Sequence, residues 1–466
     1  MKHIRILLLL IYILGGCSKA EFLSKEPDSS KLELKTLDQL QALLDYDLLM
    51  NGRERTGIDP NYLLIGADDY FMPEPNLTTI VSDPFFRNLY TWNDKMHDTE
   101  VDNWSRIYTA IFYANAALDG LDQIVKNNEN GRQYDFVKGA SLFFRARFFF
   151  QLAQVFAPPY NSLTAESDLG VVLRLKSDVN EKLKRSTVKE TYDKIIGDLK
   201  EAAVRLPVTT NLPYKTRPNK AAAYMMLAKV LLLTKDYQQS LKYADSALTI
   251  QNKLMDFNDF TSATQTSTAL PIPVDNPEVI FFSMFMGTYN TIVSPSLARI
   301  DSTLYKSYEL NDLRRNVFFT ANAANDVTFK GNYIGYFDNY FSGLAVDELY
   351  LIRAENKVRL GLISEGLQDL NTLMVKRWKV GSFVPFSTSD PSTALALILT
   401  ERRKELVQRG TRWTDLRRLN LEGYNISITR ILENQTYTLK PNDKRYTSLI
   451  PPNVISINPS IIQNAR

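Results

Sequence analysis

Two residue types that build many catalytic and metal sites are nearly missing from this sequence. The 466 residues include one cysteine, Cys17, and two histidines, His3 and His97. A disulfide within the chain and a zinc site made of several thiolates are therefore excluded. His97 lies in a polar run, where we expect an ordinary solvated histidine rather than a member of a catalytic triad. We predict no catalytic residue, no metal site and no cofactor.

The chain also lacks a strong charge of either sign and a long apolar run. Its 55 Lys and Arg residues are nearly balanced by 52 Asp and Glu residues, and the two signs are interleaved along the sequence. Nucleic-acid binding therefore has no support. The apolar run at residues 6–14 holds about nine residues, fewer than the roughly 20 that a helix needs to cross a bilayer.

The N-terminus has the features of an export signal followed by a lipid attachment site. Lys2 and Arg5 precede the apolar run, and Leu-Gly-Gly comes directly before Cys17. We predict that residues 1–16 are a signal peptide and that Cys17 is lipidated. A chance cysteine after an ordinary signal peptide is the alternative. Two or three acyl chains on one residue make a lasting membrane anchor.

Residues 17–35 are mostly polar, contain Pro27, and hold one apolar pair, Phe22 and Leu23. This composition predicts a lipidated tether between the membrane and a single folded domain at residues 36–466. With 44% hydrophobic residues, a chain of this length can bury a large core.

Apolar residues recur at helical spacing in several segments. The clearest are residues 35–50, 104–125, 136–156 and 187–206. The last of these begins with Thr187 and Glu190 at capping-box spacing and stops before Pro207, which are start and stop signals of a helix.

Two segments, residues 220–250 and 346–378, resemble helical hairpin repeats. In the first, Ala228 is a small residue among leucines, and Lys235 marks a short turn. In the second, Ala354 and Gly361 supply small positions seven residues apart. Small residues let two helices approach, and bulky ones fill the groove of the next hairpin, as in a tetratricopeptide repeat of about 34 residues. A pair of unrelated helical hairpins is the alternative.

Residues 255–343 have a different character, with clustered prolines, many aromatics, and strand-like runs such as residues 279–285 between Gly, Asn and Asp turns. Excursions of this length in compact domains are usually functional. The sequence thus predicts a mainly α fold with a loop-rich excursion containing short strands. Tetratricopeptide-like hairpins are expected near residues 104–156, 187–250 and 346–378.

The C-terminal part is rich in charge. Residues 394–410 predict a helix that ends at Gly410. The alternating charges around Glu401 and Arg417 are more simply explained by a structural ion-pair network than by an acid–base site. From Tyr446 onward, several prolines predict an extended tail.

Aromatic residues outside the predicted core are candidates for ligand binding, because a flat ring suits the apolar face of a sugar. Trp104, Trp378 and Trp413 lie among apolar residues and are assigned to the core. Trp92 precedes a polar loop and fits either role, and the tyrosines of the excursion are flanked by Gly and Asn, as in a surface platform. The candidate ligand-binding residues are Tyr70, Phe71, Trp92, Tyr289, Tyr333, Tyr336 and Tyr340.

Asp68 and Asp69 form an acidic pair beside Tyr70 and Phe71. A glycoside hydrolase needs two carboxylates that converge across a bond, roughly 5–9.5 Å apart. Neighbours in sequence usually point apart, so this pair does not indicate hydrolysis. A loop that presents Tyr70 and Phe71 for binding, or their packing in the core, fits better.

Ordered motifs run along the chain after Cys17. They include Phe22-Leu23, Trp104 with Tyr108, and the segments at residues 139–152, 221–248, 276–281, 311–315, 348–355, 401–406, 412–418 and 450–464. In this order they resemble the SusD/RagB family of Bacteroidetes nutrient-uptake lipoproteins. The chain is shorter than expected for the family, which leaves less room for surface loops.

The resemblance implies a tetratricopeptide-like scaffold that sits as a lid over a TonB-dependent outer-membrane transporter of the SusC type. Such a protein captures a glycan, or in some members a peptide, at the cell surface and delivers it inward without covalent chemistry. One alternative is a tetratricopeptide-type assembly lipoprotein that binds other proteins. Another is a surface glycoside hydrolase with converging carboxylates in a cleft.

Overall fold

The computed structural model describes residues 34–74, 84–93, 102–209, 215–260, 270, 275–287, 292–321, 326–335 and 339–466. Cys17 and the rest of the predicted signal peptide and tether up to residue 33 lie outside these ranges. Across the described ranges, none of the helices combines the length and the apolar character needed to cross a lipid bilayer.

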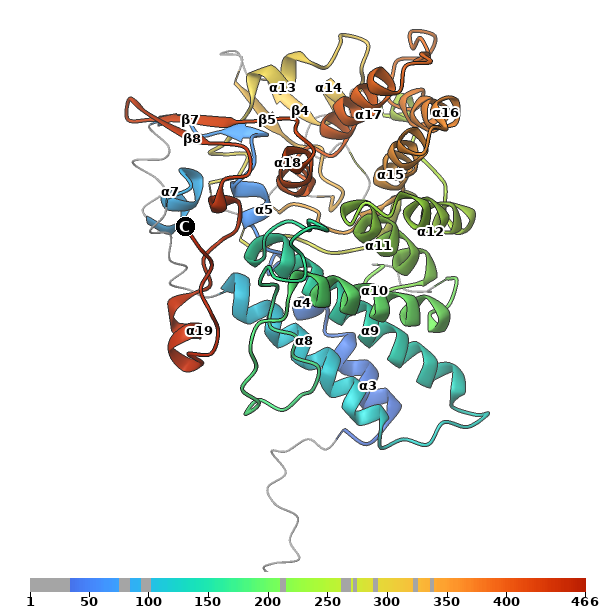
Figure 1. The fold of residues 1–466 in the computed structure, drawn as a ribbon. Helices are drawn as coiled ribbons and strands as arrows, with labels where there is room; N and C mark the ends of the chain where they lie inside the picture. Colours follow the sequence, from blue (N-terminus) through green and yellow to red (C-terminus); the bar gives the residue numbers. More distant parts are fainter. Residues whose placement is uncertain are drawn as a thin grey trace, which may run out of the picture.

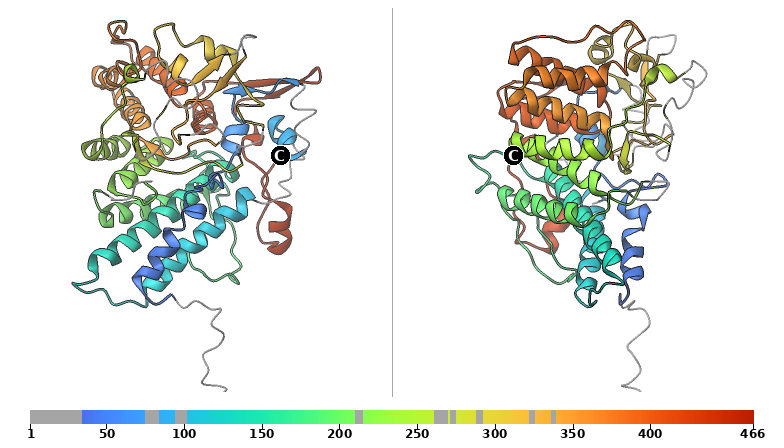
Figure 2. Two further views of the ribbon diagram at one scale, coloured as in Figure 1. Left: turned by 180° about the vertical axis from the view of Figure 1, so that it is seen from behind. Right: turned by 90° about the vertical axis from the view of Figure 1, so that its right-hand side faces the viewer.

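Helices in sequence order form a stack that is the scaffold of the fold. Each packs on the next along the chain, and α12 packs on α15 across the excursion. Figures 1 and 2 show the stack rising from α8 and α9 to α16 and α17. The scaffold helices are α8 (Asp102–Leu121), α9 (Gly131–Phe156), α10 (Val188–Arg205), α11 (Lys220–Leu233), α12 (Tyr237–Ile250), α15 (Val346–Arg359), α16 (Ile363–Met374) and α17 (Pro391–Glu405).

The predicted hairpin at residues 220–250 is confirmed as α11 and α12. Lys235 adopts a positive φ of 64° in the turn, and the Asp236 side chain caps α12. The Ser240 hydroxyl donates to the Ala228 carbonyl oxygen at 2.7 Å, so the two helices touch where both side chains are small.

The hairpin α15–α16 is also present, but Gly361 does not pack between its helices. Gly361 lies in the turn at φ 84°. The close contact is made by Gly366, where a Cβ would lie 2.7 Å from Val358 Cγ2 and 2.9 Å from the Ala354 carbonyl oxygen. The prediction for Gly361 is wrong because a left-handed turn, not helix packing, requires glycine there.

Helix α10 begins and ends where the sequence signals predict. The Glu190 backbone N–H donates to Thr187 Oγ1 at 3.1 Å, and the Thr187 N–H donates to Glu190 Oε2 at 2.8 Å. This capping box satisfies two donors that the helix itself leaves unpaired. Pro207 follows the C-cap residue Leu206.

Residues 35–50 form two helices instead of the predicted one, α3 (Leu37–Leu44) and α4 (Asp47–Met50). Asp45, which ends α3, accepts a hydrogen bond from Arg217 Nε at 2.7 Å. This contact comes from a residue far along the chain, so apolar periodicity carries no sign of it.

The described strands form two-stranded antiparallel sheets. The predicted strand at residues 279–285 is shorter in the structure, where β2 ends at Phe281. Beyond Phe281 the chain leaves β6, and the Asn51 side-chain amide donates to the Phe282 carbonyl oxygen at 2.8 Å. The pairs are β1 (Tyr70–Phe71) with β3 (Arg299–Ile300), β2 (Val279–Phe281) with β6 (Leu344–Ala345), β4 (Phe319–Ala321) with β5 (Val327–Phe329), and β7 (Ile428–Leu432) with β8 (Gln435–Leu439).

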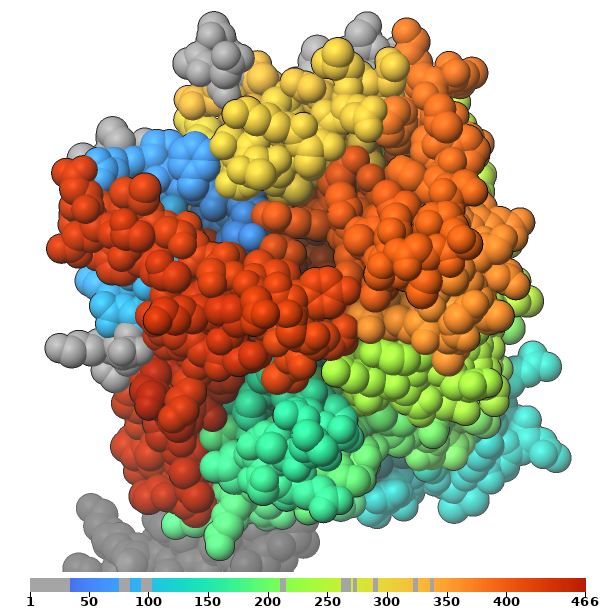
Figure 3. All heavy atoms as spheres, turned by 45° about the horizontal axis from the view of Figure 1, so that its top comes forward, coloured from blue at the N-terminus to red at the C-terminus, as the bar shows by residue number. Residues whose placement is uncertain are grey.

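Short helices lie in the excursion and in the remaining connections. The excursion therefore contains the predicted short strands and, in addition, helical turns. The short helices are α5 (Tyr62–Ile65), α7 (Pro84–Tyr90), η2 (Phe257–Asp259), α13 (Ser302–Lys306), α14 (Arg314–Val317) and η3 (Lys444–Tyr446). On one face, the excursion (yellow), the α15–α17 region (orange) and the C-terminal segments (red) surround a depression (Figure 3).

The C-terminal helices differ from the prediction at both ends. Helix α17 ends at Glu405, and Gly410 (φ 69°) precedes the next helix, α18 (Thr411–Leu421). A Cβ on Gly410 would lie 2.4 Å from Phe285 Cζ, so packing and backbone both require glycine. The tail is not wholly extended: α19 (Pro452–Ile457) starts with proline, whose missing N–H costs nothing at the first helical position.

Candidate functional site

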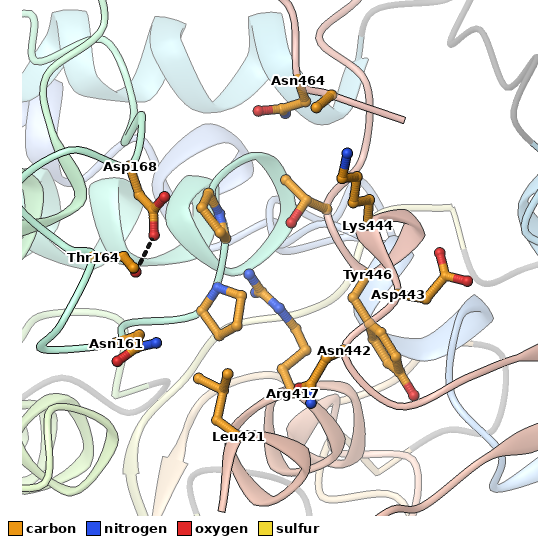
Figure 4. A pocket seen from close by; sticks show the side chains of 14 residues that line it. Asn161, Thr164, Asp168, Arg417, Leu421, Asn442, Asp443, Lys444, Tyr446 and Asn464 are labelled. Carbon is orange, nitrogen blue, oxygen red and sulfur yellow. Dashed lines mark hydrogen bonds between the residues drawn. The ribbon is translucent and has the colours of Figure 1, made fainter.

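A surface cleft with a volume of about 290 Å³ lies where the C-terminal end of α9 meets α18 and the C-terminal tail (Figure 4). We call it the α9 cleft. Its lining residues are Pro158, Pro159, Asn161, Thr164, Asp168, Arg417, Leu421, Asn442, Asp443, Lys444, Tyr446, Thr447, Asn464 and Ala465.

Two buried arginines fix the end of α9 beside the cleft. Arg417 donates to the carbonyl oxygens of Gln154 and Ala157, and Arg185 Nη2 donates to that of Phe156 at 3.0 Å. These carbonyls carry the partial negative charge of a helix C-terminus, which favours cations. Burial lowers the pKa of both arginines to about 10. The two prolines after α9 are thereby held in place.

Amide and ammonium groups line the rim of the cleft. Asn464 belongs to its framework, because its side-chain amide donates to the carbonyl oxygens of Phe156 at 2.9 Å and Ser448 at 2.6 Å. Asn442 donates to the Asn420 carbonyl oxygen at 3.2 Å and keeps its own side-chain oxygen for other donors. Within the described ranges, the Lys444 ammonium forms no hydrogen bond or ion pair.

Two carboxylates also line the cleft. Asp168 accepts from the Thr164 hydroxyl at 2.6 Å, the interaction drawn as a dashed line in Figure 4. Asp443 accepts from Arg445 Nε at 2.9 Å and Nη2 at 2.7 Å. These hydrogen bonds lower the pKa of Asp443. Asp443 is therefore a hydrogen-bond acceptor, whereas the acid of a glycoside hydrolase needs a raised pKa.

The α9 cleft combines polar groups with apolar surface. Amides, hydroxyls, carboxylates and an ammonium supply donors and acceptors around a base that includes proline and leucine side chains. Ligand sites commonly combine an apolar base with a few placed polar groups. The described residues contain no group of three or more His, Cys, Asp or Glu side chains that could hold a metal ion.

Tyr70 and Trp92, two of the predicted ligand-binding residues, are instead core residues around an arginine. Each is 3% exposed. The Cζ atom of Arg430 on β7 lies 5.2 Å from the Tyr70 ring centroid, 4.7 Å from that of Trp92 and 3.9 Å from that of Tyr90. The rings receive a guanidinium of the same protein, an attraction of cation–π type. They present no face to a ligand.

Tyr333 and Tyr340 are buried as well, at 2% and 1% exposure. The Tyr333 ring lies 4.7 Å from Arg409 Cζ, and the Tyr340 hydroxyl donates to the Val293 carbonyl oxygen at 2.7 Å. The predicted surface platform is therefore wrong for both. Flanking Gly and Asn mark turns correctly, but these turns direct the rings into the core.

The remaining candidates have different outcomes. Phe71 is 42% exposed and lies on β1, outside the lining of the α9 cleft. Tyr289, Tyr336 and the lipidation candidate Cys17 lie outside the described residues.

The charged C-terminal cluster is an ion-pair network, as predicted, with one correction. Glu405 binds Arg377 Nε at 2.7 Å and Arg314 Nη1 at 3.1 Å. Arg417 does not belong to the network, but its neighbour Arg418 does, through Glu355 at 2.9 Å.

Some carboxyl groups have raised pKa values, but they are sealed in the core. Burial raises the pKa of Glu278 to about 7 and that of Asp69 to about 6. Glu278 is 0% exposed and Asp69 is 4% exposed. Against the effect of burial, Arg412 and Arg403 lower the pKa of the adjacent Asp68 to about 2. Asp69 is buried, whereas the partly exposed Asp68 carboxylate is bound by Arg412 Nε at 2.6 Å and by Arg403 Nη2 at 3.1 Å, so these arginines and burial account for the difference between the two pKa values.

None of the cleft residues was identified as a candidate from the sequence. They come from four segments, residues 158–168, 417–421, 442–447 and 464–465. No spacing rule joins these segments. The only local signal is the Pro158-Pro159 pair directly after a long apolar helix.

Comparison with known proteins gives a consistent result. Residues 21–232 match the family described as starch-binding and associating with the outer membrane. A SusD-like protein of Formosa agariphila is 24% identical over 382 residues, covering 68% of this chain and 71% of the relative.

Solved structures share the fold across nearly the whole chain. A Bacteroides vulgatus protein assigned to sugar binding superposes with a TM-score of 0.74 at 22% identity, covering 93% of this chain and 99% of the other. A surface glycan-binding protein of Bacteroides uniformis gives a TM-score of 0.70 at 17% identity, with coverages of 92% and 99%. These likenesses establish a mainly α, tetratricopeptide-like fold.

Proposed function

We propose that this chain, which belongs to the SusD/RagB family, is a surface lipoprotein that binds a glycan in the α9 cleft and delivers it to a SusC-type transporter. The observation that carries the binding proposal is the donor and acceptor set of the cleft around its apolar base. Hydroxyl-rich ligands need such groups at several angles, and the apolar part matches the C–H face of a sugar ring.

Attachment to the outer membrane through Cys17 is part of the proposal. It is supported by the charged start, the short apolar run and the Leu-Gly-Gly-Cys sequence. Metabolic labelling with a fatty acid should mark the wild-type protein, and Cys17→Ala should abolish the label. An unlabelled wild-type protein would refute the anchor without touching the binding proposal.

Glycan binding is tested by screening residues 18–466 against soluble glycans and then measuring affinity by calorimetry. Asn442→Ala combined with Lys444→Ala should weaken binding by roughly tenfold or more, because each lost hydrogen bond contributes about 0.5–1.5 kcal/mol. The matched control is Asn252→Ala with Lys253→Ala, the same residue types at exposed positions after α12. Equal affinity in both double variants would exclude the α9 cleft as the site.

The screen should include peptides and a turnover assay. A peptide as the only ligand would change the substrate class but keep the site. Hydrolysis of a polysaccharide, lost on changing one Asp or Glu, would overturn the binding role, although the relatives' descriptions name binding. Delivery is tested by co-purification of the lipidated protein with a TonB-dependent barrel, and its consistent absence would count against a SusC-type partner.

A further inference from the structure

A second hollow, between α8 and α19, differs in chemistry from the α9 cleft. Its volume is about 490 Å³. Trp104, Tyr108 and Phe112 form its base on successive turns of α8, about 6 Å apart along the axis. We call it the α8–α19 groove. Its other lining residues are Ser105, Thr109, Val172, Arg174, Val179, Val454, Ile457, Asn458 and Ile461.

Two apolar side chains at the groove are open to solvent, although Ser105, Thr109, Arg174 and Asn458 also line it. Val179 is 71% exposed and Ile457 is 78% exposed. Contiguous apolar surface of this kind is costly in water and usually marks a contact with another apolar group. The occupant should therefore carry large apolar side chains.

We propose that the groove is occupied by Phe22 and Leu23 of the same chain. The described chain begins at Leu34, whose carbonyl oxygen would lie 3.5 Å from a Cβ on Gly120. Gly120 belongs to α8, the helix that forms the base of the groove. The N-terminal segment therefore enters the fold beside the helix that carries the groove.

The length of the segment is sufficient. Along α8, Gly120 is about 12 Å from Phe112 and about 24 Å from Trp104. The eleven residue-to-residue steps from Leu34 back to Leu23 span at most about 36–40 Å when extended. Leu32, two residues from Leu34, reaches only about 7 Å. Phe22 and Leu23 are thus the apolar pair of this segment that can fill the groove.

Docking would set the position of the domain at the membrane. Residues 18–21 would remain between Cys17 and the docked pair, a span of roughly 20 Å at most. The α8–α19 face would then lie close to the membrane surface. This consequence rests on the proposed lipidation of Cys17, whereas docking itself does not.

Disulfide trapping tests the contact directly, because the chain has no cysteine besides Cys17. In a chain beginning at residue 17 with Cys17→Ser, Leu23→Cys is paired with Ile457→Cys. The control pairs Leu23→Cys with Leu310→Cys, an exposed leucine of the excursion. We expect an intramolecular disulfide in the first pair and little in the control. Equal trapping, or disulfides between two chains, would overturn the proposal.

Hydrogen exchange gives a second test that does not need new thiols. Residues 20–26 should exchange at least roughly tenfold more slowly in the wild-type chain than after Val179→Asp with Ile457→Asp, a factor that corresponds to about 1.4 kcal/mol. Both changed side chains are exposed, so the fold is retained. Val380→Asp with Val384→Asp, each 79% exposed, is the matched control and should leave the protection unchanged. Equal exchange in all three chains would refute docking.

Discussion

Arg417 and Arg418 are neighbours on α18, yet their guanidinium groups lie in opposite surroundings. Arg417 faces the α9 cleft and binds only backbone carbonyl oxygens, those of Gln154 and Ala157. Arg418 faces the scaffold and binds the carboxylates of Glu355 at 2.9 Å and Asp415 at 2.8 Å. Burial lowers the pKa of Arg417 to about 10, whereas the two carboxylates raise that of Arg418 well above its usual value.

The difference separates two tasks of one helix. On the scaffold side, full charges compensate each other and join α15, α17 and α18. On the cleft side, the partial negative charges at the C-terminal end of α9 hold the Arg417 guanidinium without neutralising its charge. The loss of a single charge should therefore lower the free energy of unfolding far more on the network side than on the cleft side.

The largest effect is expected for Glu355→Gln on the network side. Glu355 is 0% exposed and pairs with both Arg418 and Arg359. Removing one partner of a buried ion pair costs about 3–5 kcal/mol, because a buried charge is left uncompensated. Urea denaturation measures the change. Glu365→Gln, at an exposed position of α16, should stay within about 0.5 kcal/mol; similar losses in both variants would contradict the buried network.

Arg417→Met should cost less, about 2–3 kcal/mol, because it leaves two buried carbonyl oxygens without donors. The methionine fills much of the volume, so the loss reports the missing hydrogen bonds. Hydrogen exchange should increase at the last turn of α9 and leave α15 unchanged. Faster exchange in both helices would mean that Arg417 supports the whole core and that the two sides of α18 are not separate.

The burial of Glu278 also predicts a dependence of stability on pH. The folded-state pKa of Glu278 is raised to about 7 from an ordinary 4.5, so the folded protein retains a proton that the unfolded chain releases. The stability from this group is complete below pH 4.5 and is lost as the pH rises toward 7. One proton changes the free energy of unfolding by at most about 1.4 kcal/mol per pH unit.

Urea denaturation at pH 5.5 and 6.5 measures how the free energy of unfolding changes with pH. The Glu278→Gln variant should show a smaller change than the wild-type protein. Asp415, whose pKa is lowered to about 2, acts in the opposite sense. Its stabilising contribution is present above pH 3.8 and is lost below it, outside this window. An unchanged slope in Glu278→Gln would show that the proton is held elsewhere.

Local sequence signals predicted the parts of the fold that depend on neighbours in sequence. The capping box of Thr187 and Glu190 predicted the start of α10 and Pro207 predicted its end. Small residues at short spacing predicted the α11–α12 hairpin. The break at Asp45 was missed by apolar periodicity, and the contact that Asp45 makes there comes from Arg217, which is far away in sequence. The glycine signal at Gly410 marked the start of α18 rather than the end of α17, and the close approach of Phe285 to Gly410 is likewise invisible in the local sequence.

The site was harder to predict for the same physical reason. The composition showed that the chain has many aromatic rings. It did not show that Arg430 would occupy the space between three of them, Tyr70, Tyr90 and Trp92, which lie more than 300 positions before Arg430 in the chain. An aromatic face suits a sugar and a guanidinium equally well, so residue type alone does not choose between them. Tertiary contacts decided, and they placed these rings inside.

The smallest effect is expected at the rim of the α9 cleft, for Asp443→Asn. Asp443 and Arg445 form an ion pair with side chains 21% and 27% exposed, so water screens the charges. Pairs of this kind contribute at most about 1 kcal/mol. Urea denaturation should therefore show a change below that value, while calorimetry shows altered ligand affinity, since Asn still accepts hydrogen bonds but lacks the charge. A loss as large as that of Glu355→Gln would remove the distinction between the two sides of α18.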